Sequence, residues 1–128
     1  YPTEDGTCIR DYIHVCDLAD AHVLALNCFD LEEFSFMKVK KNLLNIYNLG
    51  NGSGFSVKEI LSITENIANK KIKNSIFPRR EGDPAVLIAS YLKINNELGW
   101  KPKFPNIYDI ILHAYNWHKK ILGQTKIN

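Results

Sequence analysis

The sequence predicts an α/β fold, because short strand-like runs alternate along the chain with segments whose apolar residues recur at helical spacing. Strands are expected over residues 9–15 and 43–49, with a short third strand over 75–77. The helices are expected over residues 17–30, 57–69, 91–98 and 107–121. At 128 residues, the chain is long enough for one domain at most.

The first strand runs directly into the first helix. Asp17 is the expected helix N-cap, and Asp20 would add a second carboxylate near the positive end of the helix. Arg10 therefore stands on a strand just before a capped helix, a geometry that suits a guanidinium group binding an anion. An ion pair from Arg10 to Asp11 or Asp17 is the simpler alternative and stays open.

The remaining helices carry recognisable end signals. Ser56 and Glu59 predict a capping box at the second helix. Between the first and second helices, residues 31–44 are polar and basic, and we expect them to form a loop insertion. Ser90 is the expected cap of the third helix, which Gly99 ends. Asn106 is expected to cap the last helix, with Gly123 as its end.

A second group of arginines follows in the proline-bounded turn from Phe77 to Pro84. It holds Arg79 and Arg80, with Asp83 close by. Two arginine sites on separate rigid elements suit a pyrophosphate beside a ribose, since guanidinium groups hold phosphate oxygens and a carboxylate accepts from sugar hydroxyls. A solvated basic turn is the simpler alternative.

Composition excludes several classes of function. The hydrophobic share of 45% and the charged share of 23% are typical of a globular protein. A net charge of +2 is too small to indicate binding to nucleic acid or a membrane, and no apolar run is long enough to span a bilayer. Three cysteines without C-x-x-C spacing indicate free thiols and a cytoplasmic location. Because the chain starts at Tyr1 without Met, we expect it to be part of a longer protein.

Two further patterns imitate functional sites. The loop Gly50–Gly54 lies between a strand and a helix, as in a dinucleotide fingerprint, but its spacing differs from G-x-G-x-x-G and no acidic residue follows about twenty residues later. We therefore expect a flexible connecting turn there. The histidines lack metal-ligand spacing, so we expect no metal site. His14 and His22 are expected to be structural or solvent-facing, and His113 and His118 to have no functional role.

Three blocks of the sequence carry a family resemblance. They run from Asp5 to Ala21, from Asn45 to Gly52 with Ser56 and Val57, and from Pro78 to Asp83. In this order and spacing they resemble the C-terminal part of the UDP-glucose 4-epimerase family, which consists of NAD-dependent extended short-chain dehydrogenases/reductases. The resemblance covers nearly the whole chain. It implies a Rossmann-type fold in which residues 9–50 pack on the sheet of the NAD domain and residues 51–128 form the substrate-binding lobe, with the N-terminal NAD-binding domain absent.

The resemblance also implies roles for five residues. Arg10 and Arg80 match the arginines that hold the UDP diphosphate, and Asp83 matches the acid that binds the uridine ribose. Tyr12 matches a tyrosine near the uridine end. Leu87 stands where the family often has tyrosine or cysteine at a position that helps set hexose size, so acceptance of N-acetylated sugars stays open.

The function implied is binding of the UDP-hexose by an enzyme that interconverts UDP-galactose and UDP-glucose through a 4-keto intermediate, as a homodimer. No catalytic residue is expected here, because the family's catalytic Ser/Thr, its Tyr-x-x-x-Lys pair and its NAD fingerprint lie in the absent domain. Tyr115 and Lys119 match that pair in spacing alone. The chain by itself is expected to be inactive. The alternatives are another NAD-dependent nucleotide-sugar epimerase, dehydratase or decarboxylase, and a non-catalytic UDP-sugar-binding or interaction module.

Overall fold

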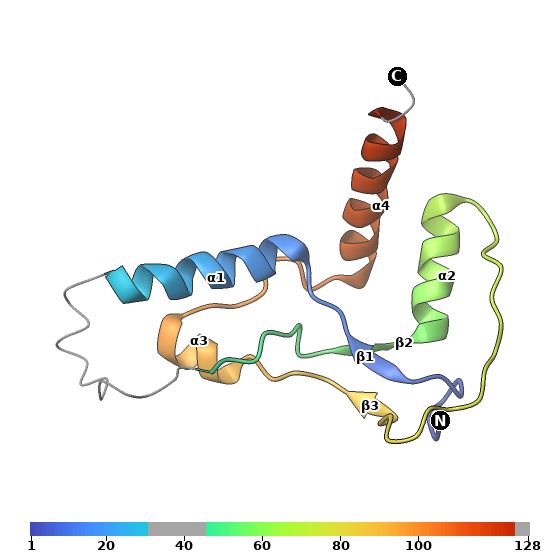
Figure 1. Cartoon of the computed structure of the whole chain (residues 1–128), viewed down its shortest axis with the longest axis horizontal. Helices are drawn as coiled ribbons and strands as arrows, with labels where there is room; N and C mark the ends of the chain where they lie inside the picture. The colour runs from blue at the N-terminus through green and yellow to red at the C-terminus, as the bar shows by residue number, and fades with distance from the viewer. Residues whose placement is uncertain (31–45, 125–128) are drawn as a thin grey trace.

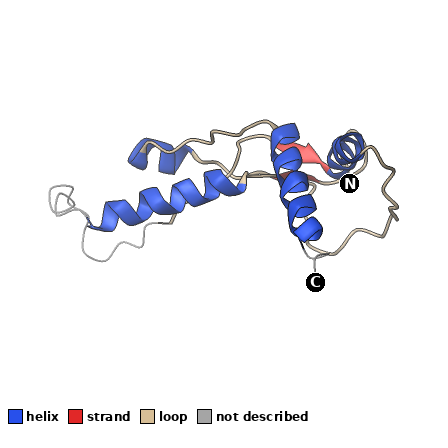
Figure 2. Cartoon of the chain, turned by 90° about the horizontal axis from the view of Figure 1, so that it is seen from above, coloured by secondary structure: helices blue, strands red, loops and turns tan. Residues whose placement is uncertain are grey.

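The computed structural model describes residues 1–30 and 46–124, and within them it confirms a mixed helix and strand fold. Helices α1 (Val15–Asp30) and α3 (Leu92–Leu98) lie at one end of an elongated molecule, as Figure 1 shows. A small sheet and helix α2 (Val57–Ala68) lie at the other end, and helix α4 (Ile107–Gln124) rises between the two ends. The view from above in Figure 2 likewise shows α4 between the end with α1 and α3 and the end with α2 and the sheet.

The sheet has three short strands in the order β2-β1-β3. The central strand β1 (Ile9–Asp11) pairs antiparallel with β2 (Gly54–Ser56) and parallel with β3 (Val86–Leu87). In this register the partners of Arg10 are Phe55 on one side and Leu87 on the other. Arg10 is therefore held in the middle of the sheet, with paired backbone on both sides.

The predicted strands differ from the observed ones. The first is confined to Ile9–Asp11, residues 46–49 and 75–77 are not strand, and β2 and β3 were not predicted. Tyr47 and Leu49 are apolar because they pack against the core formed with α1 and α3, and not because they belong to a sheet. The predicted loop insertion over 31–44 and residues 43–45 of the second predicted strand lie outside the described residues.

Helix α1 begins at Val15, so the prediction that Asp17 is its N-cap was wrong. Asp17 lies inside the first turn and is buried, with 1% of its surface exposed. Its carboxylate accepts hydrogen bonds from the backbone N–H groups of Lys103 (2.9 Å) and Phe104 (3.0 Å). This carboxylate therefore fastens α1 to the segment that precedes α4.

The end signals of the other helices were mostly correct. Ser56 and Glu59 form the expected capping box of α2, and Asn106 accepts a hydrogen bond from Tyr108 N–H (2.8 Å) at the start of α4. Gly99 ends α3 in the left-handed conformation, with φ of 71°. Two signals were misplaced, since Tyr91 and not Ser90 occupies the N-cap of α3, and α4 continues past Gly123.

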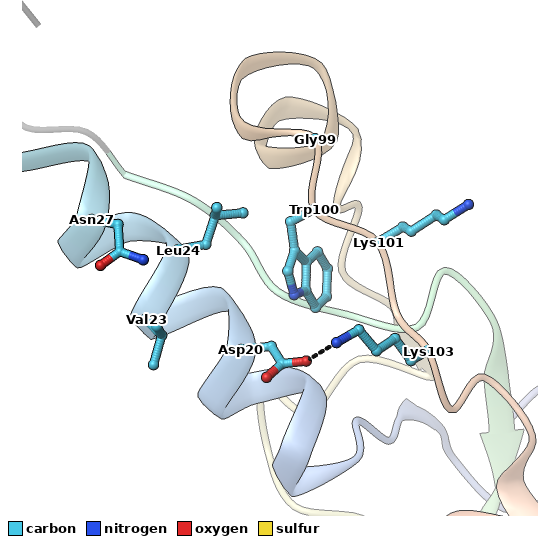
Figure 3. A pocket seen from close by; sticks show the side chains of 8 residues that line it. All are labelled: Asp20, Val23, Leu24, Asn27, Gly99, Trp100, Lys101 and Lys103. Atoms are coloured by element: carbon cyan, nitrogen blue, oxygen red, sulfur yellow. Dashed lines mark hydrogen bonds and ion pairs between the residues drawn. The ribbon is translucent and has the colours of Figure 1, made fainter. Parts of the chain in front are cut away.

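The core joins α1 to α3. Ala21, Ile94 and Trp100 are its buried members, and Tyr47, Leu49 and Tyr91 are among the half-buried residues around them. The indole N–H of Trp100 donates to the backbone oxygen of Asp17 (3.2 Å). Figure 3 shows Trp100 beside α1, in the wall of a pocket of about 400 Å³ where Asp20 pairs with Lys103.

Candidate functional site

Arg10 and Asp83, 73 residues apart in sequence, form the centre of the candidate site. Arg10 Nη2 lies 2.5 Å from Asp83 Oδ1, and Arg10 Nη1 donates to the backbone oxygen of Ile9 (2.7 Å). The exposed fractions of the two side chains are 22% and 15%. The ion pair is partly sheltered from water, so its attraction is screened less than that of a surface pair.

The partner of Arg10 is therefore Asp83, and not Asp11 or Asp17 as in the simpler alternative. Asp11 accepts hydrogen bonds from the backbone N–H groups of Asn51 (2.9 Å) and Ala89 (3.0 Å). Asp17 is occupied by backbone donors ahead of α4. Arg10 therefore pairs across the fold with the arginine-rich turn.

Arg80 reaches the same carboxylate from the other side. Its Nη2 lies 3.4 Å from Asp83 Oδ2, and its side chain is 85% exposed. The structure thus brings together three of the five residues singled out from the sequence, Arg10, Arg80 and Asp83. Two guanidinium groups that share one carboxylate are spaced so that both can reach the oxygens of one anion.

The other two residues lie close to Arg10 in the chain or the sheet. Leu87 is the neighbour of Arg10 on β3 and is 58% exposed. Tyr12 follows β1 and is half-buried. Burial raises the pKa of the Tyr12 hydroxyl above its usual value, a shift that the Arg10 charge partly opposes.

Two further residues complete the group: Tyr1, which the sequence did not single out, and Arg79, which it placed in the arginine turn without a separate role. Tyr1 donates its hydroxyl hydrogen to Asp83 Oδ2 (2.5 Å), and Arg79 donates from Nε (3.0 Å) and Nη2 (2.5 Å) to the backbone oxygen of Asp83. The guanidinium carbon of Arg79 lies 5.0 Å from the centre of the Tyr1 ring. Arg79 is therefore held in place by contacts within the turn and with Tyr1. The alternative of a solvated basic turn did not predict these contacts.

The charge state of the site follows from these contacts. The Tyr1 hydroxyl and the Arg10 and Arg80 charges hold the pKa of the Asp83 carboxyl below its usual value, although partial burial opposes them. The hydrogen bond to Asp83 raises the pKa of the Tyr1 hydroxyl. At neutral pH the site therefore combines an ionised Asp83, a neutral Tyr1 and cationic arginines.

The glycine loop is a connecting segment, as expected, but it packs closely against neighbouring residues, which its spacing did not predict. A Cβ added to Gly50 would lie 2.7 Å from Ala89 Cβ, and one added to Gly54 would lie 2.6 Å from Ile88 Cδ1. The backbone N–H of Asn51 already donates to Asp11. These glycines make room for neighbouring segments of this chain.

Of the histidines in the described residues, His14 has a structural role, whereas His22, His113 and His118 are exposed. His14 is buried and stacks on Phe104, with ring centres 4.4 Å apart, and its Nε2 lies 3.0 Å from His113 Nδ1. Across residues 1–30 and 46–124, no group of three or more His, Cys, Asp or Glu side chains is placed to hold a metal ion. The helices described there also include none long and apolar enough to cross a membrane.

Comparisons of sequence and of structure both match this chain to UDP-glucose 4-epimerases. The chain is 50% identical over 120 residues to the UDP-glucose 4-epimerase of Halalkalibacterium halodurans, an alignment that covers 94% of this chain and 33% of the relative. A UDP-glucose 4-epimerase crystal structure matches with a TM-score of 0.79 and 48% identity, over 94% of this chain and 34% of that chain. The Bifidobacterium longum UDP-glucose 4-epimerase in complex with NAD+ and UDP matches with a TM-score of 0.76 and 40% identity, over 94% of this chain and 32% of that chain.

No protein-family model matches the chain. The chain spans about one third of the length of the curated relatives that it matches. Sequence and fold together identify it as related to the C-terminal part of the UDP-glucose 4-epimerases, which are extended short-chain dehydrogenases/reductases with a Rossmann-type fold.

Proposed function

We propose that this chain forms the UDP-hexose-binding part of a UDP-glucose 4-epimerase, which interconverts UDP-galactose and UDP-glucose. Arg10 and Arg80 hold the diphosphate in this proposal, and Asp83 accepts hydrogen bonds from the ribose. The observation that carries it is the convergence of Arg10 and Arg80 on the Asp83 carboxylate. The relatives' names, and the UDP in the Bifidobacterium longum structure, support the choice of ligand.

The two arginines have complementary physical roles in this proposal. Arg10 is fixed on the central strand and half-buried, so it meets a phosphate with little loss of side-chain entropy. Arg80 is exposed and can close on the ligand from the turn. A UDP-sugar held by its nucleotide and diphosphate leaves the hexose as the mobile end, which an epimerase needs because the sugar must present either face.

Tyr12 and Leu87 complete the proposed site. Both lie beside Arg10, so they can contact the same ligand, with Tyr12 near the uridine end. Leu87 offers an exposed apolar side chain without a hydrogen-bonding group. We propose that it contacts the hexose by packing alone.

NAD is the cofactor of this family, in which it takes a hydride from the sugar and returns it. The glycine loop of this chain does not fit the dinucleotide, because Asp11, Ala89 and Ile88 fill the space around Gly50 and Gly54. We propose that another part of the enzyme binds NAD and supplies the catalytic residues, and that this chain alone is inactive.

We also propose that the chain has two parts with different roles. Residues 9–50 pack on the NAD-domain sheet, and residues 51–128 form the substrate lobe. Exposed apolar side chains on α1 support the first part, among them Val15 (72%), Val23 (56%) and Leu26 (63%). The free thiols of Cys8 and Cys16 support a cytoplasmic enzyme. A homodimer without nucleic-acid or membrane partners is the assembly that the family resemblance suggests.

The direct test is Arg80→Ala in the intact enzyme. We expect the KM for UDP-galactose to rise more than tenfold, because a diphosphate contact is lost. An unchanged KM would refute the assignment of the site. Product analysis with UDP-glucose as substrate separates a 4-epimerase from a dehydratase or a decarboxylase of the same superfamily.

A UDP-binding module without catalysis is the second candidate, because Tyr1, Arg10, Arg79, Arg80 and Asp83 assemble within this chain alone. Titration of the isolated chain with UDP in a calorimeter discriminates the two. Binding by a folded monomer favours the module, whereas aggregation or the absence of binding favours a part that needs the rest of an enzyme.

A further inference from the structure

Arg79 contacts Asp83 in a different way from Arg10 and Arg80, whose guanidinium groups pair with the Asp83 carboxylate. Two of its nitrogens, Nε and Nη2, donate to the backbone oxygen of Asp83, four residues later in the chain. Because these two donors share one acceptor, they close the turn that carries Arg80 and Asp83. The same turn holds Gly82 in a left-handed conformation, with φ of 74°.

Tyr1 makes this arrangement a closed ring of contacts. The hydroxyl of Tyr1 donates to the Asp83 carboxylate (2.5 Å), and its aromatic face lies under the Arg79 guanidinium, 5.0 Å away. Arg79 in turn holds the backbone of Asp83. Asp83 is therefore fixed at both its carbonyl and its carboxylate, by two residues that contact each other.

This ring requires an arginine. Lysine has a single nitrogen and no planar face, so it cannot make both hydrogen bonds to Asp83 while stacking on Tyr1. An arginine whose only purpose was solubility would be replaceable by lysine without effect.

We propose that Arg79 is a positioning residue for nucleotide-sugar binding, which fixes the turn from Arg79 to Asp83 so that Arg80 and Asp83 face the ligand together with Arg10. This inference rests on the proposed function. It adds that the affinity for the nucleotide depends on a residue that does not touch it, and that Tyr1 acts in the same unit.

The experiment uses the intact enzyme with Arg79→Met and the control Lys73→Met, which removes the same charge from an exposed position on the same loop. We expect Arg79→Met to raise the KM for UDP-galactose and the Kd for UDP by the same factor, at least fivefold, with kcat within twofold. This split follows because the turn binds the nucleotide and not the reacting carbon of the hexose. Lys73→Met should leave both constants unchanged.

Two further variants keep the test decisive. Arg79→Lys, which retains the charge, should weaken UDP binding nearly as much as Arg79→Met, and it decides the matter if the methionine variant fails to fold. Tyr1→Phe should weaken binding in the same direction, and its effect should add to that of Arg79→Met less than fully, because both act through Asp83.

Two results would overturn this inference. One is wild-type UDP affinity in both Arg79 variants, and the other is wild-type UDP affinity in Arg79→Lys when Arg79→Met binds UDP weakly. Arg80→Ala distinguishes the two levels of the argument. If Arg80→Ala weakens UDP binding and the Arg79 variants do not, only the positioning role fails. If none of these variants weakens UDP binding, the proposed function fails.

Discussion

Asp83 shows how one carboxylate organises side chains that are far apart in the sequence. Arg10 approaches one of its oxygens, and Tyr1 and Arg80 approach the other. A carboxylate offers about four acceptor positions, so the three contacts leave room for one further donor such as a ribose hydroxyl. At this scale, the site is a preassembled set of charges and hydrogen bonds.

Asp5 gives a pH-dependent prediction at the same scale. Hydrogen bonds from Ser56 and Thr7 lower the pKa of the Asp5 carboxyl to about 2, so the folded state favours its ionised form. The resulting stability is fully present above the ordinary value of 3.8 and is lost as the pH falls through about 2.

We therefore expect the wild-type chain to lose more free energy of unfolding than Asp5→Asn when the pH is lowered from 5 to 3. Urea unfolding at the two pH values measures the difference. Glu4→Gln, a substitution at the exposed neighbouring residue, is the control and should keep the wild-type pH dependence. An equal loss in Asp5→Asn and wild type would contradict the assignment.

At the scale of elements, helices are fixed by a few polar side chains at their ends. Asp17 connects α1 to the segment before α4, and Ser56 both caps α2 and donates to Asp5. These contacts join segments that the hydrophobic core, which is small in the described residues, does not hold by itself.

Removal of the Asp17 carboxylate should strongly destabilise the protein. Asp17→Ala removes a buried carboxylate and leaves the half-sheltered backbone N–H groups of Lys103 and Phe104 without their acceptor, at a total cost of about 1–3 kcal/mol. Asp20→Ala, three residues later on α1, removes an ion pair that water screens and should cost less than about 1 kcal/mol. Denaturant unfolding of both variants checks this order, and equal costs would contradict it.

Loss of the capping box of α2 should reduce the free energy of unfolding less than loss of the Asp17 carboxylate does. Ser56→Ala should lower the free energy of unfolding by about 1 kcal/mol through the lost N-cap, with an additional loss from its hydrogen bond to Asp5. Ser53→Ala, in the preceding loop and exposed, is the matched control and should be neutral. Thermal unfolding followed by circular dichroism compares them, and a neutral Ser56→Ala would show that the cap is dispensable.

At the scale of the whole molecule, one buried cluster holds α1, α3 and residues 47–49 together, and α4 rises beside α2 (Figure 1). Trp100 is 4% exposed within this cluster, whereas Trp117 on α4 is 59% exposed. The two tryptophans therefore report on the inside and the outside of the same protein.

Trp100→Ala should cost about 3–5 kcal/mol, or prevent folding, because it leaves a cavity and removes the hydrogen bond to Asp17. Trp117→Ala should cost less than about 1 kcal/mol. The midpoints of denaturant unfolding give the comparison. Similar values for the two variants would contradict the position of the core.

The helices could largely be predicted from the sequence, because capping residues and apolar periodicity act locally. Ser56, Gly99 and Asn106 marked their helix ends correctly. The strands β2 and β3 could not be predicted, since strands of 3 and 2 residues are too short to show alternation. Tyr47 and Leu49 were misassigned to a strand because burial in a core and burial in a sheet leave the same apolar signal.

For the site, the two arginine positions with Asp83 alongside already grouped Arg10, Arg80 and Asp83, and the family resemblance added a separate role for each. The structure brings the three side chains together. The partnership of Tyr1 with Asp83 spans 82 residues and has no local signal. Arg79 did carry a signal, since the turn around Gly82 places residues 79 and 83 close together. Its hydrogen bonds could have been anticipated from that spacing.

The central claim is that Arg10 and Arg80 converge to hold one nucleotide diphosphate, and calorimetric titration of the intact enzyme with UDP tests it most directly. Arg80 suits the test because its side chain is 85% exposed, so its removal leaves the packing intact. We expect Arg80→Ala to weaken UDP binding at least tenfold, and Lys73→Met to bind as the wild type does. Wild-type affinity for UDP in a folded Arg80→Ala enzyme would contradict the account.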